Sequence, residues 1–79
     1  MKLITSQDGR QVFTIGLNNY INIAPVEVED GAKIKPYSIG ISGVSAGVFK
    51  DEKKAKAPLD DVAAFLSGKD TAYTIPADK

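Results

Sequence analysis

The hydrophobic pattern of this 79-residue chain changes its period once, and this change constrains the fold more than any other feature. Up to Phe49, apolar residues alternate with other residues, as Phe13, Ile15 and Leu17 do. That period of two is typical of strands with one buried face. From Ala55 onward the apolar residues recur every three or four positions, as in an amphipathic helix. Strands followed by a helix, rather than alternating with it, predict an α+β domain with an antiparallel sheet.

Turn residues divide the first part of the chain into short strands over roughly residues 2–49. Asp8-Gly9 is a dipeptide typical of a tight hairpin turn. Val26 and Val28 alternate with glutamates, which predicts a half-exposed strand that closes at Asp30-Gly31.

The helix is predicted over roughly residues 58–67. Pro58 is tolerated in the first turn of a helix but costs about 3 kcal/mol or more in its interior. The pattern leaves open whether the helix continues through Pro58. Gly68 is a suitable C-terminal stop. Alternation over roughly 71–75 then predicts a short final strand, which Pro76 closes.

A chain of this length forms one domain, because chains usually divide only above roughly 250–300 residues. One helix covering one face of a curled sheet would bury both apolar stripes, and a small open barrel plugged by the helix is a close variant. The residues expected to dominate the core are Phe13, Ile15, Ile21, Ile23, Ile39, Ile41, Leu59, Val62 and Leu66.

The composition excludes several kinds of chemistry. The chain has no cysteine, histidine or tryptophan. Disulfides, thiolate or imidazole metal sites and Ser-His-Asp catalysis are therefore excluded. We expect no catalytic residues, no cofactor, no metal site and no enzymatic activity.

Two short motifs resemble functional signatures. Residues 43–47 match the Gly-x-Ser-x-Gly pattern of a hydrolase nucleophile elbow, but that site needs a histidine to accept the serine proton. Ser67-Gly68-Lys69 resembles the end of a phosphate-binding loop, but it follows the predicted helix instead of preceding it. We interpret the first motif as a glycine-rich bend in a sheet and the second as a helix C-cap.

One basic cluster could contact nucleic acid. It consists of Lys50, Lys53, Lys54 and Lys56, diluted by two acidic residues between them. Tyr37 or Phe49 beside the cluster would add base stacking. The chain as a whole has a net charge of zero, which favours interpreting the cluster as a solvated turn.

The first residues turn polar after Met1-Lys2-Leu3-Ile4, and no apolar run has the length of a signal peptide or of a membrane span. A small cysteine-free domain of this kind is expected to be cytoplasmic, without contact with a membrane.

An arrangement of residues that spans nearly the whole chain resembles a group of small uncharacterised proteins of Gram-positive bacteria and their phages. In that group a run of strands ends in a glycine-aromatic segment, followed by an acidic cap and an amphipathic helix. The sequence departs from the arrangement at Pro58 and in the tail after Lys69. The resemblance implies a small α+β domain and supplies no site residue or activity. The residues that carry it are Met1-Lys2-Leu3-Ile4, Asp8-Gly9, Val12, Ile15, Asn19-Tyr20-Ile21, Ile39, Gly47-Val48-Phe49, Asp51-Glu52, Ala55, Leu59, Asp61-Val62 and Phe65-Leu66.

These observations predict a non-enzymatic binding or assembly module whose partner is another protein chain. The alternative is a nucleic-acid-binding accessory protein that uses the four clustered lysines. We also expect self-association into a homodimer, because zero net charge weakens repulsion and open sheet edges favour pairing. The interface candidates are Phe65 on the helix and Tyr73 and Ile75 in the final strand.

Overall fold

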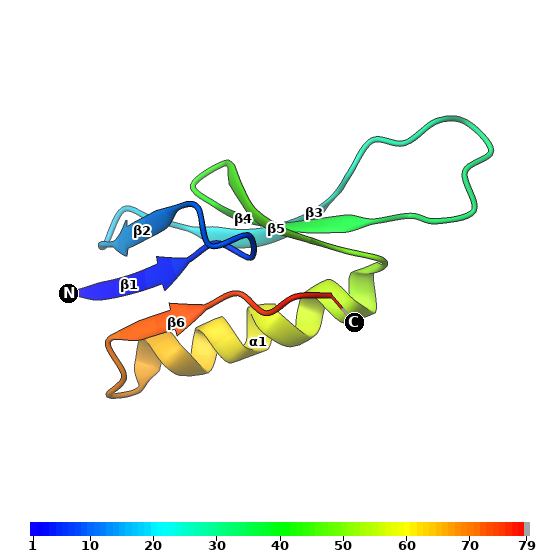
Figure 1. Cartoon of the computed structure of the whole chain (residues 1–79). Helices are drawn as coiled ribbons and strands as arrows, with labels where there is room; N and C mark the ends of the chain where they lie inside the picture. The colour runs from blue at the N-terminus through cyan, green and yellow to red at the C-terminus, as the bar shows by residue number, and fades with distance from the viewer. Residues whose placement is uncertain (79) are drawn as a thin grey trace.

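Two three-stranded sheets and one helix make up the fold, as shown in Figure 1, a computed structural model that describes residues 1–78. The first sheet has the strand order β2-β1-β6. Its central strand β1 (Lys2–Thr5) pairs antiparallel with β2 (Val12–Ile15) and parallel with β6 (Ala72–Thr74). The parallel pairing arises because the chain reaches β6 only after crossing the helix.

The second sheet is an antiparallel meander of β3 (Ile21–Pro25), β4 (Tyr37–Ile41) and β5 (Val44–Phe49). The helix α1 (Glu52–Ser67) follows it and packs against all three of these strands. The predicted α+β class is confirmed, with strands first, one helix after them and a short last strand. Within residues 1–78 the two sheets do not close into a barrel.

The turn between β1 and β2 forms where Asp8-Gly9 predicts it. Gly9 has φ +74°, in the left-handed region that favours glycine, and its N–H donates to the Ser6 carbonyl at 2.9 Å. The Asp8 carboxylate accepts from the Ser6 hydroxyl at 2.6 Å and from the Arg10 N–H at 2.9 Å. These hydrogen bonds lower the pKa of Asp8 because they favour its charged form, and the bond from Ser6 has the largest effect.

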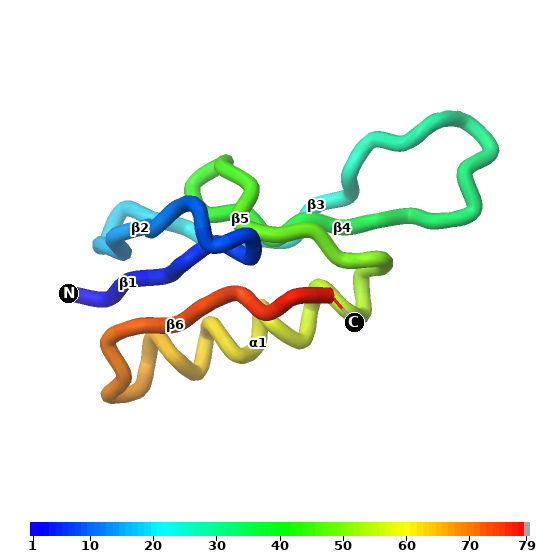
Figure 2. Tube along the Cα trace, viewed as in Figure 1, coloured from blue at the N-terminus to red at the C-terminus, as the bar shows by residue number. Residues whose placement is uncertain are grey.

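Residues 26–36 form no strand, so the predicted strand through Val26 and Val28 is wrong. The loop leaves the body of the molecule in Figure 2 and is closed at its base by one bond, from the Val26 N–H to the Pro36 carbonyl at 2.9 Å. Val28 is exposed in this loop. Alternation alone cannot form a strand where neither a neighbouring strand nor the helix lies close enough to cover the apolar side.

The helix begins at Glu52, six residues before the predicted start, and Pro58 lies inside it. Asp51 is the N-cap, and its carboxylate accepts from the Lys54 N–H at 2.8 Å. The proline removes one helical hydrogen bond, but its ring is buried on the same face as Ala55. The cap and this buried surface offset the lost bond, so the first turns remain helical.

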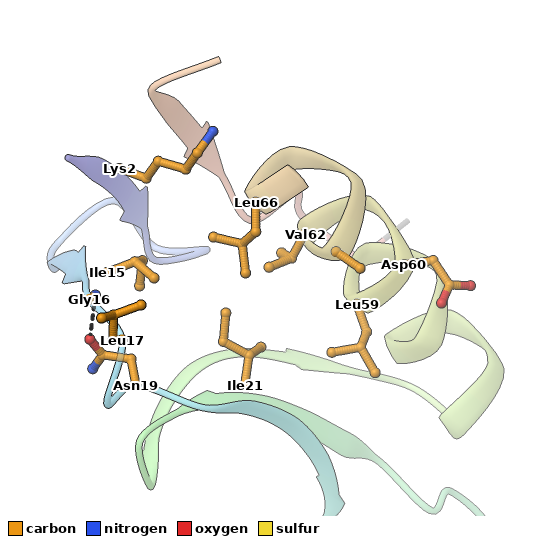
Figure 3. Close-up of a pocket in the computed structure, with 11 residues that line it drawn as sticks. Lys2, Ile15, Gly16, Leu17, Asn19, Ile21, Leu59, Asp60, Val62 and Leu66 are labelled. Atoms are coloured by element: carbon orange, nitrogen blue, oxygen red, sulfur yellow. Dashed lines mark hydrogen bonds between the residues drawn. The ribbon is translucent and has the colours of Figure 1, made fainter. Parts of the chain in front are cut away.

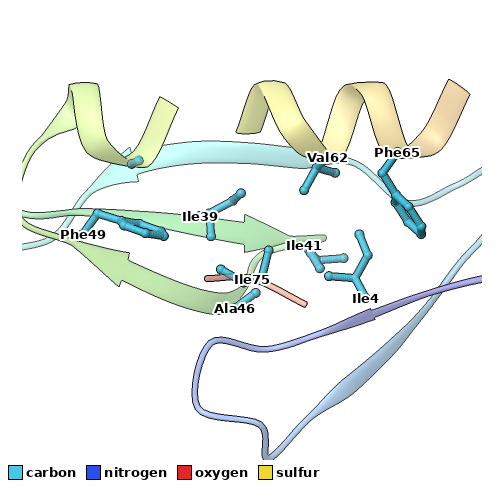
Figure 4. Close-up of a cluster of buried hydrophobic side chains, with 9 residues drawn as sticks. Ile4, Ile39, Ile41, Ala46, Phe49, Val62, Phe65 and Ile75 are labelled. Atoms are coloured by element: carbon cyan, nitrogen blue, oxygen red, sulfur yellow. The ribbon is translucent and has the colours of Figure 1, made fainter. Parts of the chain in front are cut away.

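The core lies beneath α1, where buried side chains of both sheets meet (Figure 4). Of the nine predicted core residues, only Ile39, Ile41 and Val62 are fully buried. The prediction that Leu66 lies in the core is wrong, because the helix turns Phe65 inward and leaves Leu66 36% exposed. The other predicted residues are half-buried and pack against the core: Phe13, Ile15, Ile21, Ile23 and Leu59. The prediction omitted the buried residues Ile4, Ala46, Phe49, Ala55, Phe65 and Ile75.

Gln7 joins the two sheets. Its N–H donates to the Ala46 carbonyl of β5 at 2.7 Å. Its side-chain amide pairs with Val48 in both directions: Nε2 donates to the Val48 carbonyl at 3.1 Å, and Oε1 accepts from the Val48 N–H at 2.9 Å. Nε2 also donates to the Pro76 carbonyl beyond β6 at 3.0 Å. The amide therefore acts like a peptide group inserted between β5 and the segment after β6.

Gly47 allows this close approach. A Cβ atom at position 47 would lie 3.0 Å from the Cβ of Gln7 and 3.0 Å from Cγ2 of Ile75, closer than most such contacts. A larger residue would therefore require the side chains of Gln7 and Ile75 to move away from β5.

We predict that Gln7→Ala lowers the free energy of unfolding by about 1.5–4.5 kcal/mol, because three hydrogen bonds of about 0.5–1.5 kcal/mol each are lost. Urea unfolding measures this, with Gln11→Ala as the control, since the Gln11 side chain is exposed on the neighbouring turn. Equal midpoints for the two variants would show that the amide does not hold the sheets together.

Candidate functional site

An apolar groove of about 770 Å³ lies between α1 and the segment that joins β2 to β3 (Figure 3). The helix forms one wall and the end of β2 with the following turn forms the other, while the first residue of β3 lies between them. The groove is open to solvent. Its large apolar side chains are Ile15, Leu17, Ile21, Leu59, Val62 and Leu66.

The groove exists because the apolar face of α1 is wider than the surface that covers it. One stripe, Ala55, Pro58, Val62 and Phe65, is buried. The adjacent stripe, Leu59, Ala63 and Leu66, lies at helical spacing of four and three and lines the groove. The sequence pattern indicated an apolar helix face and could not show that only part of it would be covered.

Lys2 closes one end of the groove, and its ammonium group is fully used within the chain. Nζ donates to the carbonyls of Phe65 at 2.9 Å, Gly68 at 2.9 Å and Asp70 at 2.6 Å. It also lies 4.8 Å from the centre of the Phe65 ring. A positive charge at the last carbonyls of a helix stabilises its C-terminus. Lys2 is therefore a helix cap rather than a ligand-binding group.

Gly68 is the C-cap residue that Ser67-Gly68-Lys69 predicts, but its φ is −96° rather than positive. Its N–H donates to the Phe65 carbonyl at 3.2 Å. The Lys2 ammonium, from a strand far away in sequence, satisfies carbonyls that a left-handed glycine cap would otherwise bond. Sequence reasoning did not single out Lys2.

The turn on the opposite wall of the groove is held by Asn19. Its Oδ1 accepts from the Gly16 N–H at 2.7 Å, and its Nδ2 donates to the Ser42 hydroxyl at 3.0 Å. Both ends of this amide are thus engaged within the chain. Leu17 lies in this turn with its side chain fully exposed, although its alternation with Ile15 predicts a buried strand residue.

Asp60 is the only acidic residue among those that line the groove, and it is exposed at its edge. No cluster of three or more acidic residues within residues 1–78 could hold a metal ion. The groove thus offers a bounded apolar surface to a ligand. The side chains of Lys2 and Asn19 are hydrogen-bonded within the chain, which leaves the Asp60 carboxylate.

The Gly-x-Ser-x-Gly motif lies in a hairpin and not at a strand-to-helix turn. Ser42 and Gly43 have φ values of +52° and +87° and form the two-residue turn between β4 and β5. Ser45 follows inside β5, beside a register shift at Ile39/Gly40. The interpretation as a glycine-rich bend in a sheet is confirmed.

The four clustered lysines gather at the start of α1 and are all exposed. They do not form a stacking site with Phe49, because that ring is buried in the core. Tyr37 is half-buried nearby, and its hydroxyl is hydrogen-bonded to Glu52, which raises the pKa of the phenol. The cluster comprises Lys50, Lys53, Lys54 and Lys56.

The predicted interface residues are mostly inside the molecule. Phe65 is 7% exposed and Ile75 is 1% exposed, so neither can form a surface for a partner. Tyr73 is half-buried, with its ring centre 5.6 Å from that of Phe65. Burial, with a smaller effect from the Asp61 charge, raises the pKa of Tyr73. The final strand is therefore a structural element that covers the end of the helix.

Comparison with known proteins finds no matching protein family, curated protein or solved structure. The one helix described within residues 1–78 is not long and apolar enough to cross a membrane.

We predict that Lys2→Met lowers the free energy of unfolding by about 1–2 kcal/mol, because the helix C-terminus loses its charged cap while the apolar stem is kept. Thermal or urea unfolding measures the change, with Lys69→Met as the matched control, since Lys69 is exposed. A loss no greater than that of the control would contradict the capping role.

Proposed function

We propose that this chain is a non-enzymatic, cytoplasmic binding module, of bacterial or phage origin, that holds an apolar segment of another protein chain in the groove. The observation that carries the proposal is the incompletely covered apolar stripe of α1, with Leu59 half-buried and Ala63 and Leu66 exposed, beside an open cavity of about 770 Å³. Exposed apolar surface of this kind is typical of interaction sites.

A protein partner fits the groove better than a polar small molecule does. Small-molecule sites combine apolar walls with a few polar groups that converge on the ligand. Here the polar groups of Lys2 and Asn19 bond to the chain itself. The groove would therefore select apolar side chains by shape, as the apolar core of a protein–protein interface does.

The proposal includes the absence of enzymatic activity. General acid–base chemistry needs a titratable group within hydrogen-bond reach of a bound substrate. Asp60 is the one carboxylate among the groove residues, and it lies exposed to solvent at the edge of the groove. Binding by shape needs no such group.

We predict that short peptides with one leucine or phenylalanine among polar residues bind the groove. Amide NMR spectra should show saturable shifts at Leu59, Ala63 and Leu66. Ala63→Glu should weaken binding by roughly tenfold or more, because it places a charge inside an apolar contact.

Ala64→Glu is the matched control, since Ala64 is the next helix residue, is exposed and does not line the groove. It should bind as the unmodified chain does. Peptides that shift no groove residue, or that bind equally to the Ala63→Glu variant, would contradict the proposal.

A second candidate function is nucleic-acid binding through the four clustered lysines. The observation in its favour is their common exposure at one end of the molecule. Asp51 and Glu52 lie among them, and the Asp78 carboxylate accepts from the Lys50 N–H at 2.8 Å, so the local field is diluted. We therefore favour the groove.

We predict no detectable binding of single- or double-stranded DNA at about 20 mM salt, where phosphate contacts are strongest. Fluorescence anisotropy with labelled oligonucleotides measures this. Binding that weakens steeply with salt, and that Lys53→Glu reduces but Lys69→Glu does not, would favour the second function instead.

A further inference from the structure

Leu17 is an apolar side chain that the fold holds in water. Its side chain is fully exposed. Its turn is fixed: the Asn19 N–H donates to the Gly16 carbonyl at 3.2 Å, and the Asn19 side chain bonds to both Gly16 and Ser42. Exposure of Leu17 is therefore a property of an ordered turn.

The exposed leucine and the groove lie on the same face of the molecule. Leu17 stands at the rim of the cavity, opposite Leu66 and Leu59 on the helix (Figure 3). One surface thus carries both a projecting apolar side chain and a cavity bounded by apolar side chains. Such a surface can be complementary to itself.

We infer that the occupant of the groove is a second copy of this chain, with Leu17 of each copy inserted into the groove of the other. This inference rests on the proposed function and names its partner. A two-fold symmetric dimer needs the same patch on both subunits, and each pair of contacts then forms twice. The fixed turn reduces the ordering cost of binding, because Leu17 is already in place.

Charge does not oppose this contact. The net charge of the chain is zero, so two copies approach without net repulsion. Among the groove residues, the Lys2 ammonium donates to three carbonyls of its own chain, and Asp60 lies at the edge, where solvent can reach it. The centre of the contact would be apolar and its rim polar, as in known interfaces.

The surface area that the contact can bury limits the expected affinity of the dimer. Stable interfaces bury about 800 Å² on each partner, and smaller ones give weak or transient complexes. The chain exposes 5605 Å² in total, and the turn with the groove forms only part of one face of a molecule 43 Å long and 20 Å wide. We therefore expect a weak dimer that forms at high concentration.

Sedimentation equilibrium of the whole chain from about 10 μM to about 1 mM tests the inference, since this range covers dissociation constants near 0.1 mM. The apparent mass should rise from 8.4 kDa toward twice that value. Leu17→Asp and Ala63→Glu should each weaken association roughly tenfold or more, because each places a carboxylate inside the apolar contact.

Val28→Asp is the matched control for Leu17→Asp, because Val28 is 48% exposed in the loop of residues 26–36, outside the groove. Ala64→Glu is the control for Ala63→Glu. Both controls should associate as the unmodified chain does. Circular dichroism and urea midpoints show that every variant is folded, and full exposure of Leu17 means that its substitution leaves the core intact.

Two outcomes overturn the inference: a monomer mass at all concentrations, or dimers that survive either groove substitution. If the chain is monomeric while leucine peptides still saturate the groove, the partner is a foreign chain and the proposed function stands without this inference. If peptides also fail to bind, both are wrong.

Discussion

The fold depends on the point where the two sheets meet. At Gln7, one residue supplies both a backbone bond to β5 and a side-chain amide that pairs with Val48 as a peptide group would. Gly47 permits the approach, and Ile75 is buried against the same place. Each sheet has only three strands of three to six residues and could bury little apolar surface by itself. The junction lets them share one core under one helix.

The position of α1 follows from what holds its two ends. Asp51 caps the N-terminus, and the Lys2 ammonium binds the last carbonyls and lies over the Phe65 ring. These contacts bury the stripe that contains Ala55 and Phe65 and leave the neighbouring stripe open. The groove is thus a direct consequence of how the helix is tied to β1, and a different rotation of the helix would have buried Leu66 instead.

The functional proposal rests on this division of the helix surface. Most polar atoms near the groove already bond within the chain, so what remains available is apolar shape and one carboxylate. Surfaces of that kind recognise other apolar side chains. The fixed turn that carries Leu17 offers such a side chain on the same face, which connects the groove to self-association through physical complementarity.

The sequence alone determined the local features of this protein. Alternation predicted most strands, Asp8-Gly9 predicted the first hairpin, and helical spacing with Gly68 predicted the end of α1, because short-range sterics and hydrogen bonds act within a few residues. Only the tertiary structure decided the rest. Periodicity does not show which of two adjacent helix stripes is covered, whether a buried ring compensates for Pro58, or that Lys2 and Gln7 meet partners more than 40 residues away. These depend on contacts distant in sequence, and the exposed Leu17 and the open groove result from them.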